Sequence, residues 1–289
     1  MASYDSIIYS GNDLKSKHVN KVPEYAGQVE ITNFRLISPN NFPLYGLGID
    51  IQNMMTKCEI TENIFSPYVS GYVDIGDATG LFERMPIIGE EILHISFHSV
   101  GASEEDKIDR YFRVVKVTNH NKDPKNDRLL TYTLNFSSIE YIVNLATKVQ
   151  KSYCGMKISD IAKNIYDDYI NPHSPLKQML PMQVPERPEL DTEMTKGEHN
   201  LIIPNLTPFQ AMLFLASRAE VGDMMHMEED ARTRQRTRRS NGAFYCFYET
   251  IRDGFKFKSL ESLMQSSNKI EYKYAPIGTT YEDIYSQIA

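Results

Sequence analysis

Residues 28–138 alternate apolar and polar side chains in short runs rich in β-branched and aromatic residues. A period of two indicates β-strands with one buried face, because successive side chains on a strand point to opposite sides. Pro, Gly, Asn or Asp bounds each run, as is typical of turns. Six strands are predicted, at residues 28–38, 48–60, 68–76, 91–100, 109–120 and 128–138. One short helix is expected among them at "DATGLFERM", with Asp77 as its N-cap.

Near Ser137 the period changes from two to about 3.6, which favours amphipathic helices. "SSIEYIVNLATKV" begins with a capping-box pattern, Ser137 with Glu140, and "KISDIAKNIYDDYI" continues the helical period. "TPFQAMLFLASRAE" begins with Thr207 as N-cap, Pro208 at the first helical position and Gln210 completing a second box. "AFYCFYETIRDGFKFKSLESL" has two alternating runs around "RDG", which predicts a hairpin.

These patterns predict an α+β protein in which an antiparallel β-barrel or sandwich domain precedes a helical and hairpin α/β region. The β domain is expected over residues 28–137 and the α/β region over 138–275. Residues 1–27 are expected to form an N-terminal arm that is ordered by contact with a partner. Residues 171–200 are Pro-rich and charged, and predict a long connection. Residues 276–289 are expected to form a C-terminal tail.

Composition narrows the function classes. A net charge of -7 over 289 residues argues against a protein whose whole surface binds nucleic acid. Three cysteines without a short spacing fit a reducing compartment, and favour neither a disulfide framework nor a zinc site. The N-terminus lacks the pattern of a secretory signal, and no segment has the roughly 18 apolar residues of a membrane span. We therefore expect no contact with a membrane.

Motifs for catalysis and cofactor binding are missing from the sequence. The chain contains no G-x-S-x-G, no P-loop, no G-x-G-x-x-G and no H-E-x-x-H. His94 and His98 lie on one face of a predicted strand, but no third ligand has a metal-site spacing. We expect no enzymatic activity, no cofactor and no metal.

Two adjacent carboxylates, Glu90 and Glu91, stand between a turn signal and an apolar run in "LFERMPIIGEEILHISF" (81–97). Pro86 and Gly89 mark the turn, and a strand is predicted to begin at Glu91. Neighbouring side chains on a strand point to opposite faces, so the two carboxylates cannot easily act on one substrate atom. We expect them to face solvent or to contact basic groups of a neighbouring subunit.

An arginine run in "MEEDARTRQRTRRSNG" (227–242) is the strongest anomaly of composition. Its members are Arg232, Arg234, Arg236, Arg238 and Arg239. One interpretation is a loop whose guanidinium groups contact phosphates or carboxylates of a partner. The other is a solvated loop between a helix and a hairpin, which is the usual fate of a charge run. The arginines are thus candidates for partner contact.

The order of motifs resembles the baseplate hub proteins of contractile-tailed bacteriophages. The stretch "CEITENIFSPYVSGYVDIGDATGLFERMPIIGEEILHISF" (58–97) is similar to the first domain of such hubs. The pattern there is an "I-x-E-x-I-x-x-P-x-x-x-G" strand pair, then "D-x-x-x-L-F/I-E", then "P-I-I-G-E-E". "YFRVVKVTN", "TYTLNFSSIEYIVNLATKVQKSY" and "LIIPNLTPFQAMLFLASRA" continue the same order. The resemblance covers roughly residues 28–275.

The resemblance implies a structural virion protein with a tail-tube-like β domain. In the T-even phage hub, each subunit carries two tube-like domains, and three subunits form a ring of six such domains between a threefold spike and a sixfold tube. Here only one tube-like β region is evident. We expect residues 276–289 to lead toward a missing second tube-like domain, or a second subunit to complete the ring.

The implied function is a baseplate hub subunit that joins the tail tube to the central spike. The implied partners are two further copies in a homotrimer, the tail tube or a tube-initiator protein, and the central spike protein. DNA or the tape-measure protein would lie nearby in the lumen. The implied location is the tail baseplate of the virion, assembled in the host cytoplasm.

Two alternatives stay open. One is a tail-tube initiator or a wedge-adjacent baseplate protein, which would have sixfold symmetry. The other is a hub–spike module of a bacterial contractile injection or secretion system. A cell-wall hydrolase of the baseplate is disfavoured, because no segment presents two suitably spaced carboxylates beside a turn that could hold a glycan.

Overall fold

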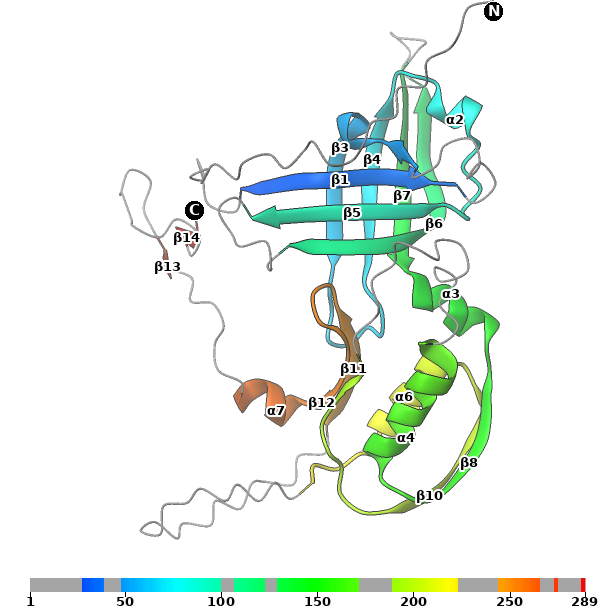
Figure 1. Ribbon diagram of the computed structural model, residues 1–289, viewed down its shortest axis with the longest axis vertical. Helices are drawn as coiled ribbons and strands as arrows, with labels where there is room; N and C mark the ends of the chain where they lie inside the picture. The colour runs from blue at the N-terminus through cyan, green and yellow to red at the C-terminus, as the bar shows by residue number, and fades with distance from the viewer. Residues whose placement is uncertain are drawn as a thin grey trace, which may run out of the picture. The chain divides into compact units, whose positions relative to one another are not determined.

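The computed structural model describes residues 28–38, 48–99, 107–122, 129–171, 189–222, 244–265, 273–274 and 287–288 (Figure 1). The chain forms two compact units. The first comprises Met1–Ile31, Phe97–Lys107 and Asn268–Ala289, and the second comprises Thr32–Ser96 and Ile108–Ser267. In the first unit, β13 (Lys273–Tyr274) pairs in parallel with β14 (Gln287–Ile288).

A seven-stranded sheet dominates the first half of the described chain, in the order β2-β1-β5-β6-β7-β4-β3. Its strands are β1 (Val29–Ile37), β2 (Ile49–Asp50), β3 (Met55–Thr61), β4 (Ser70–Asp77), β5 (Ile92–Ser99), β6 (Ile108–Lys122) and β7 (Leu130–Ser138). The pairs β1–β2, β3–β4, β4–β7 and β6–β7 are antiparallel. The part of this sheet in the second unit, with the short helix α2 (Leu81–Arg84), is called the sheet lobe.

The sheet is curled, and Figure 1 shows β1 and β5 running across the direction of β3, β4 and β7. The long strand β6 belongs to both halves of the curl. Its register to β7 shifts between Val114 and Lys116 and again between Thr118 and Asn121. Asn119, within the second shift, has a positive φ of 52°. Such bulges bend a strand and increase its twist, which allows one sheet to curl through a single long strand.

Close packing fixes β4 against its neighbours. Val73 and Leu134 are paired in the β4–β7 register, and both are fully buried. Gly71 is paired with Phe136, and a Cβ at Gly71 would lie 2.3 Å from the carbonyl oxygen of Glu59 and 2.5 Å from the Phe136 ring. Only glycine fits at this position.

The antiparallel β region predicted from the period of two is confirmed, with one correction. Residues 48–60 do not form one strand, because the 3-10 helix η2 (Gln52–Met54) separates β2 from β3. The Asp50 carboxylate accepts a hydrogen bond from the Gln52 amide at 2.9 Å, which closes a local turn where the pattern alone predicted extended chain.

The rest of the second unit, from α3 to α7, is called the α/β lobe. Its elements are α3 (Ile139–Ala146), β8 (Val149–Met156), α4 (Ile158–Ile165), the π-helical turn η4 (Tyr166–Ile170), β9 (Asp191–Thr192), β10 (His199–Leu206), α6 (Pro208–Ala216), β11 (Tyr245–Thr250), β12 (Gly254–Ser259) and α7 (Leu260–Gln265). β8 and β10 form an antiparallel pair, while β12 pairs with β11 antiparallel and with β9 in parallel.

The core of the α/β lobe lies where α4 and α6 pack with the β11–β12 hairpin. Aromatic side chains of the hairpin meet the helices there: Phe209 of α6 lies 5.8 Å from Phe247 and 6.0 Å from Phe255, measured between ring centroids. Ile161 and Ile165 of α4 belong to the same cluster and are fully buried. The hairpin is therefore part of this core.

The capping box at α6 is confirmed. The Thr207 hydroxyl accepts from the Gln210 amide, the Gln210 side chain accepts from the Thr207 amide at 3.1 Å, and Pro208 begins the helix. The helix predicted at 157–170 is present as α4 and η4, and the predicted hairpin as β11 and β12.

The capping box predicted for Ser137 and Glu140 is wrong. Strand β7 continues to Ser138, which is the N-cap residue of α3, and no side chain caps this helix. The N-cap of α2 is Gly80 and not Asp77. The Asp77 carboxylate still accepts a hydrogen bond from the Phe82 amide at 3.0 Å. It therefore binds an amide in the first turn of α2, although it lies three residues before the N-cap residue.

Strands β8 and β10 were not predicted. β9 and the first residues of β10 lie within 171–200, which was expected to be a connection throughout. Residues 172–188 of that connection, the arm 1–27 and the arginine run lie outside the described residues. The sheet lobe and the α/β lobe belong to one compact unit. The predicted division into a β domain at 28–137 and an α/β domain at 138–275 stays a prediction.

Candidate functional site

The carboxylates of Glu90 and Glu91 lie in different environments. Glu90 is exposed, as expected, whereas Glu91 is fully buried. Of the two expected alternatives, exposure to solvent is therefore wrong for Glu91, while contact with a neighbouring subunit is not tested. The two side chains do not form a pair, which agrees with the opposite faces predicted from strand geometry.

Glu91 organises the turn that precedes β5. Its Oε1 accepts from the Ile88 amide at 2.9 Å, and its Oε2 accepts from the amides of Gly89 at 2.9 Å and Glu90 at 3.1 Å. Gly89 adopts a φ of 91°, which glycine tolerates. Partner contact by Glu90 and by Glu91 stays a prediction.

Asp77 is a second buried carboxylate that binds amides of its own chain. Its Oδ1 accepts from the Thr79 amide at 2.8 Å and from the Thr79 hydroxyl at 3.0 Å, and its Oδ2 accepts from the Phe82 amide. Burial alone would raise the pKa of Asp77. Hydrogen bonds from Phe82, Leu81 and Thr79 outweigh burial and hold the pKa below its ordinary value.

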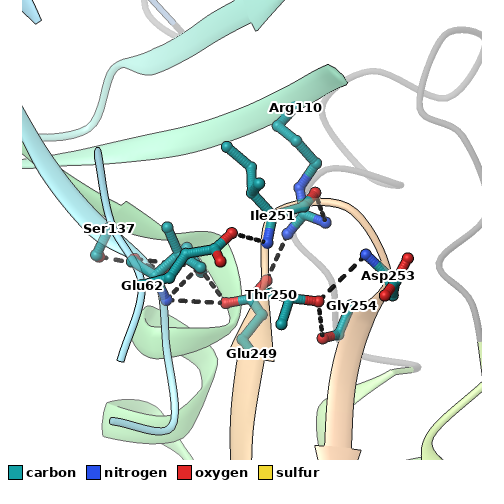
Figure 2. A network of polar contacts seen from close by, with 10 residues as sticks. Glu62, Arg110, Ser137, Glu249, Thr250, Ile251, Asp253 and Gly254 are labelled. Atoms are coloured by element: carbon teal, nitrogen blue, oxygen red, sulfur yellow. Dashed lines mark hydrogen bonds and ion pairs between the residues drawn. The ribbon is translucent and has the colours of Figure 1, made fainter. Parts of the chain in front are cut away.

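A polar network lies where the hairpin meets the sheet lobe (Figure 2). At its centre is Glu249 on β11, which has 1% of its surface exposed. Its Oε1 lies 2.5 Å from Nη2 of Arg110 on β6. Its Oε2 accepts from the Ser138 hydroxyl and, at 3.1 Å, from the Val69 amide. Glu249 thus joins the hairpin to β6, to the end of β7 and to the entry of β4.

The backbone of the hairpin tip adds two contacts to the same network. The Ile251 amide donates to Oε1 of Glu62 at 2.5 Å, and the Ile251 carbonyl accepts from Nη1 of Arg110 at 3.1 Å. Within the tip, the Asp253 amide donates to the Thr250 hydroxyl at 3.2 Å. We call Glu62, Val69, Arg110, Ser138 and Glu249, with the backbone of Ile251, the junction network.

The junction network is suited to holding a geometry. A buried carboxylate that shares both oxygens among a guanidinium, a hydroxyl and an amide has its acceptor capacity occupied by the protein itself. The hydrogen bonds of such a carboxylate are directional, so they define where its partners lie. The arrangement can therefore fix the hairpin against the sheet lobe, which is a mechanical role.

The junction network could not be predicted from the sequence pattern. Glu249 interrupts the run "AFYCFYET", whose other strand positions are mostly aromatic and buried. A single acidic residue in such a run is a local sign of a buried polar contact, because a buried charge requires a partner. Nothing in the local pattern identifies Arg110, which lies 139 residues away.

Aromatic contacts flank the network. Phe65 and Phe244 meet edge to face with ring centroids 6.3 Å apart, yet they are 65% and 54% exposed. Tyr68 packs against Tyr141 at 4.4 Å and against Phe209 at 6.4 Å. These contacts add apolar surface to the junction, but they are less directional than its hydrogen bonds.

Among the described residues, no group of three or more His, Cys, Asp or Glu side chains is arranged to hold a metal ion. His94 contacts Asp109 at 2.5 Å and stacks on Tyr111. None of the helices in the described part of the chain combines the length and the apolar character needed to span a bilayer.

No family model matches the chain, and no curated protein matches it. Among solved structures, the tail protein from Neisseria meningitidis MC58 is similar at 11% identity and a TM-score of 0.42, with 77% of this chain and 52% of that chain covered. The 43 kDa tail protein of prophage MuSo2 from Shewanella oneidensis is similar at 9% identity and a TM-score of 0.48, with 86% and 58% covered.

A third similar structure is the E. coli c3393 protein, a type VI secretion component described as similar to the T4 bacteriophage tail proteins gp27 and gp5. It has 7% identity and a TM-score of 0.38, with 87% of this chain and 53% of that chain covered. The chain spans about half the length of these three proteins. The structural neighbours are thus tail proteins and a component of a secretion system.

Proposed function

We propose that the chain is a structural subunit of a phage tail baseplate, a hub that joins the tail tube to the central spike. The observation that carries the proposal is the junction network, which fixes a curled antiparallel sheet to an α/β lobe through an ion pair whose carboxylate is fully buried. The motifs at 58–97 that resemble baseplate hubs fall on β3, β4, α2 and β5 of that sheet.

An adaptor between two assemblies must hold its contact surfaces at a defined angle. Buried, directional hydrogen bonds supply such definition where apolar contacts alone allow sliding. The most buried carboxylates of the sheet lobe support the same interpretation, because Glu91 and Asp77 are bound by amides of their own turns. Carboxylates used in this way favour a structural role over acid–base catalysis.

The proposal includes self-association as a homotrimer, with contacts to the tail tube or tube-initiator protein and to the central spike. It places the chain in the tail baseplate of the virion. The five arginines of the run would face another subunit or the lumen, and Glu90 is the exposed carboxylate available for a neighbour.

The test is the symmetry of the assembly. The purified chain is examined by mass photometry and by cryo-EM, alone and with purified tail-tube and central-spike proteins. A threefold particle that binds both proteins is expected for a hub. A sixfold ring that binds only the tube would favour a tube initiator, and a chain that binds neither protein would refute the proposal. Threefold binding to the spike of a secretion system would identify the injection-machine alternative.

Lack of enzymatic activity is part of the proposal and has its own test. Hydrolysis of peptidoglycan, phosphodiesters and peptides is measured for the wild-type chain and for the double variant Glu90→Gln/Glu91→Gln. We expect no turnover from either protein. Reproducible turnover by the wild type that is lost in the double variant would overturn the structural assignment.

A further inference from the structure

The two lobes of the second unit have one covalent connection in the described chain. Every strand of the seven-stranded sheet precedes Ile139, and every element of the α/β lobe follows Ser138. Ser138 is also a member of the junction network, since its hydroxyl donates to Glu249. The point about which the lobes could rotate is therefore next to the bonds that hold them.

The hairpin makes two kinds of contact. The base of the hairpin is anchored in the core of the α/β lobe through Phe247, Phe255 and Phe257. Its tip meets the sheet lobe through the hydrogen bonds of Glu249 and Ile251. The hairpin thus acts as an arm that is rigid at its base and held by polar bonds at its tip.

Intermediate orientations of this arm are unfavourable. A small rotation would break several hydrogen bonds of Glu249 while water is still excluded, and would leave a charge buried without its partner. A full separation would hydrate the same groups and remove that penalty. A buried network of this kind favours two discrete arrangements over a continuous range.

We propose that the junction network is an orientation lock, a two-state joint that either holds the α/β lobe at one angle to the sheet lobe or releases it as a unit. Arg110 and Glu249 are the positioning residues. The flanking rings of Phe65 and Phe244 are more than half exposed. Tyr68 packs on Tyr141 and Phe209, but such apolar contacts are less directional than the ion pair and restrict rotation less. The inference rests on contacts within the chain and does not depend on the proposed tail function.

The test measures the distance between the lobes in the full chain. Spin labels are placed on Cys154, which is exposed on β8, and on a cysteine introduced by Lys116→Cys on the exposed surface of β6. Cys58→Ser and Cys246→Ala remove the other thiols. The distance distribution is recorded by double electron–electron resonance, together with the melting temperature of each variant.

Glu249→Gln removes the negative charge that pairs with Arg110. Arg110→Met/Glu249→Gln removes both charges and keeps an acceptor for the Val69 amide. Asp168→Asn is the matched control, because it removes a carboxylate from the exposed pair between Lys151 and Asp168.

We expect one narrow distance in the parent and in Asp168→Asn. Glu249→Gln should lose that single distance and show a second, separate population. The double variant should melt closer to the parent than Glu249→Gln does, yet keep the second population, because orientation depends on the ion pair itself. A single narrow distance in every variant would overturn the lock. So would a continuous broadening, or a double variant that recovers both the melting temperature and the single distance.

Discussion

Nη2 of Arg110 and Oε1 of Glu249 lie 2.5 Å apart although 139 residues separate them in the chain, and the Glu249 side chain has no exposure to solvent. Breaking a buried ion pair from one side leaves the other charge without a partner in a region that excludes water. The pair therefore couples the stability of the hairpin to that of the sheet lobe.

Glu249→Gln should lower the free energy of unfolding by about 3 kcal/mol, because it removes the charge of the fully buried carboxylate that pairs with Arg110. Urea denaturation followed by circular dichroism measures the change. Asp168→Asn, in an exposed pair, should change the free energy by less than about 0.5 kcal/mol. Equal effects of the two substitutions would show that burial of the Arg110–Glu249 pair has no energetic consequence.

Glu91→Ala should lower the free energy of unfolding by about 3 kcal/mol, since it leaves the amides of Ile88, Gly89 and Glu90 without their acceptor. Glu90→Ala, one residue away and exposed, should change it by less than about 0.5 kcal/mol. Thermal and urea unfolding of the two variants provide the comparison. A Glu90→Ala variant as unstable as Glu91→Ala would contradict the assignment of the turn.

Asp77 should contribute to stability in a pH-dependent way. Its pKa is lower in the folded chain than the ordinary value of 3.8, so the folded state favours the ionised form. The contribution is fully present above pH 3.8 and is lost as the pH falls through the folded-state pKa. The difference in unfolding free energy between wild type and Asp77→Asn should therefore shrink as the pH falls below 3.8. A difference that stays constant down to pH 2 would argue against this role.

Gly71→Ala should destabilise the sheet lobe by about 2 kcal/mol or more, because the new methyl would overlap the Glu59 carbonyl and the Phe136 ring. Gly76→Ala is the matched control on the same strand, since its Cβ would have no neighbour closer than 3.8 Å. Thermal unfolding measures both variants. If both lose the same stability, the close approach at Gly71 is not the cause.

The three cysteines should react in a defined order. Cys154 is exposed, whereas burial raises the pKa of Cys58 to about 11 and raises that of Cys246 as well. At pH 7.5 the thiolate fraction of Cys58 is therefore on the order of 0.03%. Alkylation by iodoacetamide, followed by peptide mass spectrometry, should modify Cys154 first. Modification of Cys58 or Cys246 at the same rate would indicate that these thiols are more accessible than the structure implies.

Local patterns in the sequence were sufficient for most regular elements. The period of two predicted the antiparallel strands, and the box of Thr207 and Gln210 predicted the start of α6. Such signals are local, because a helix cap or a strand face depends on residues within a few positions of one another. The Asx turn at Asp50 was missed, and the N-cap of α3 was assigned to Ser137 instead of Ser138, because local alternatives of similar energy compete at both places.

The roles of the buried carboxylates depend on the tertiary structure. The sequence placed Glu90 and Glu91 beside a turn, but only the folded turn shows that Glu91 points inward to three amides. It placed Glu249 in a buried strand without indicating Arg110 as its partner. A pairing across 139 residues leaves no periodic signal in the chain, because it depends on how the hairpin and the curled sheet approach one another, and packing decides that approach.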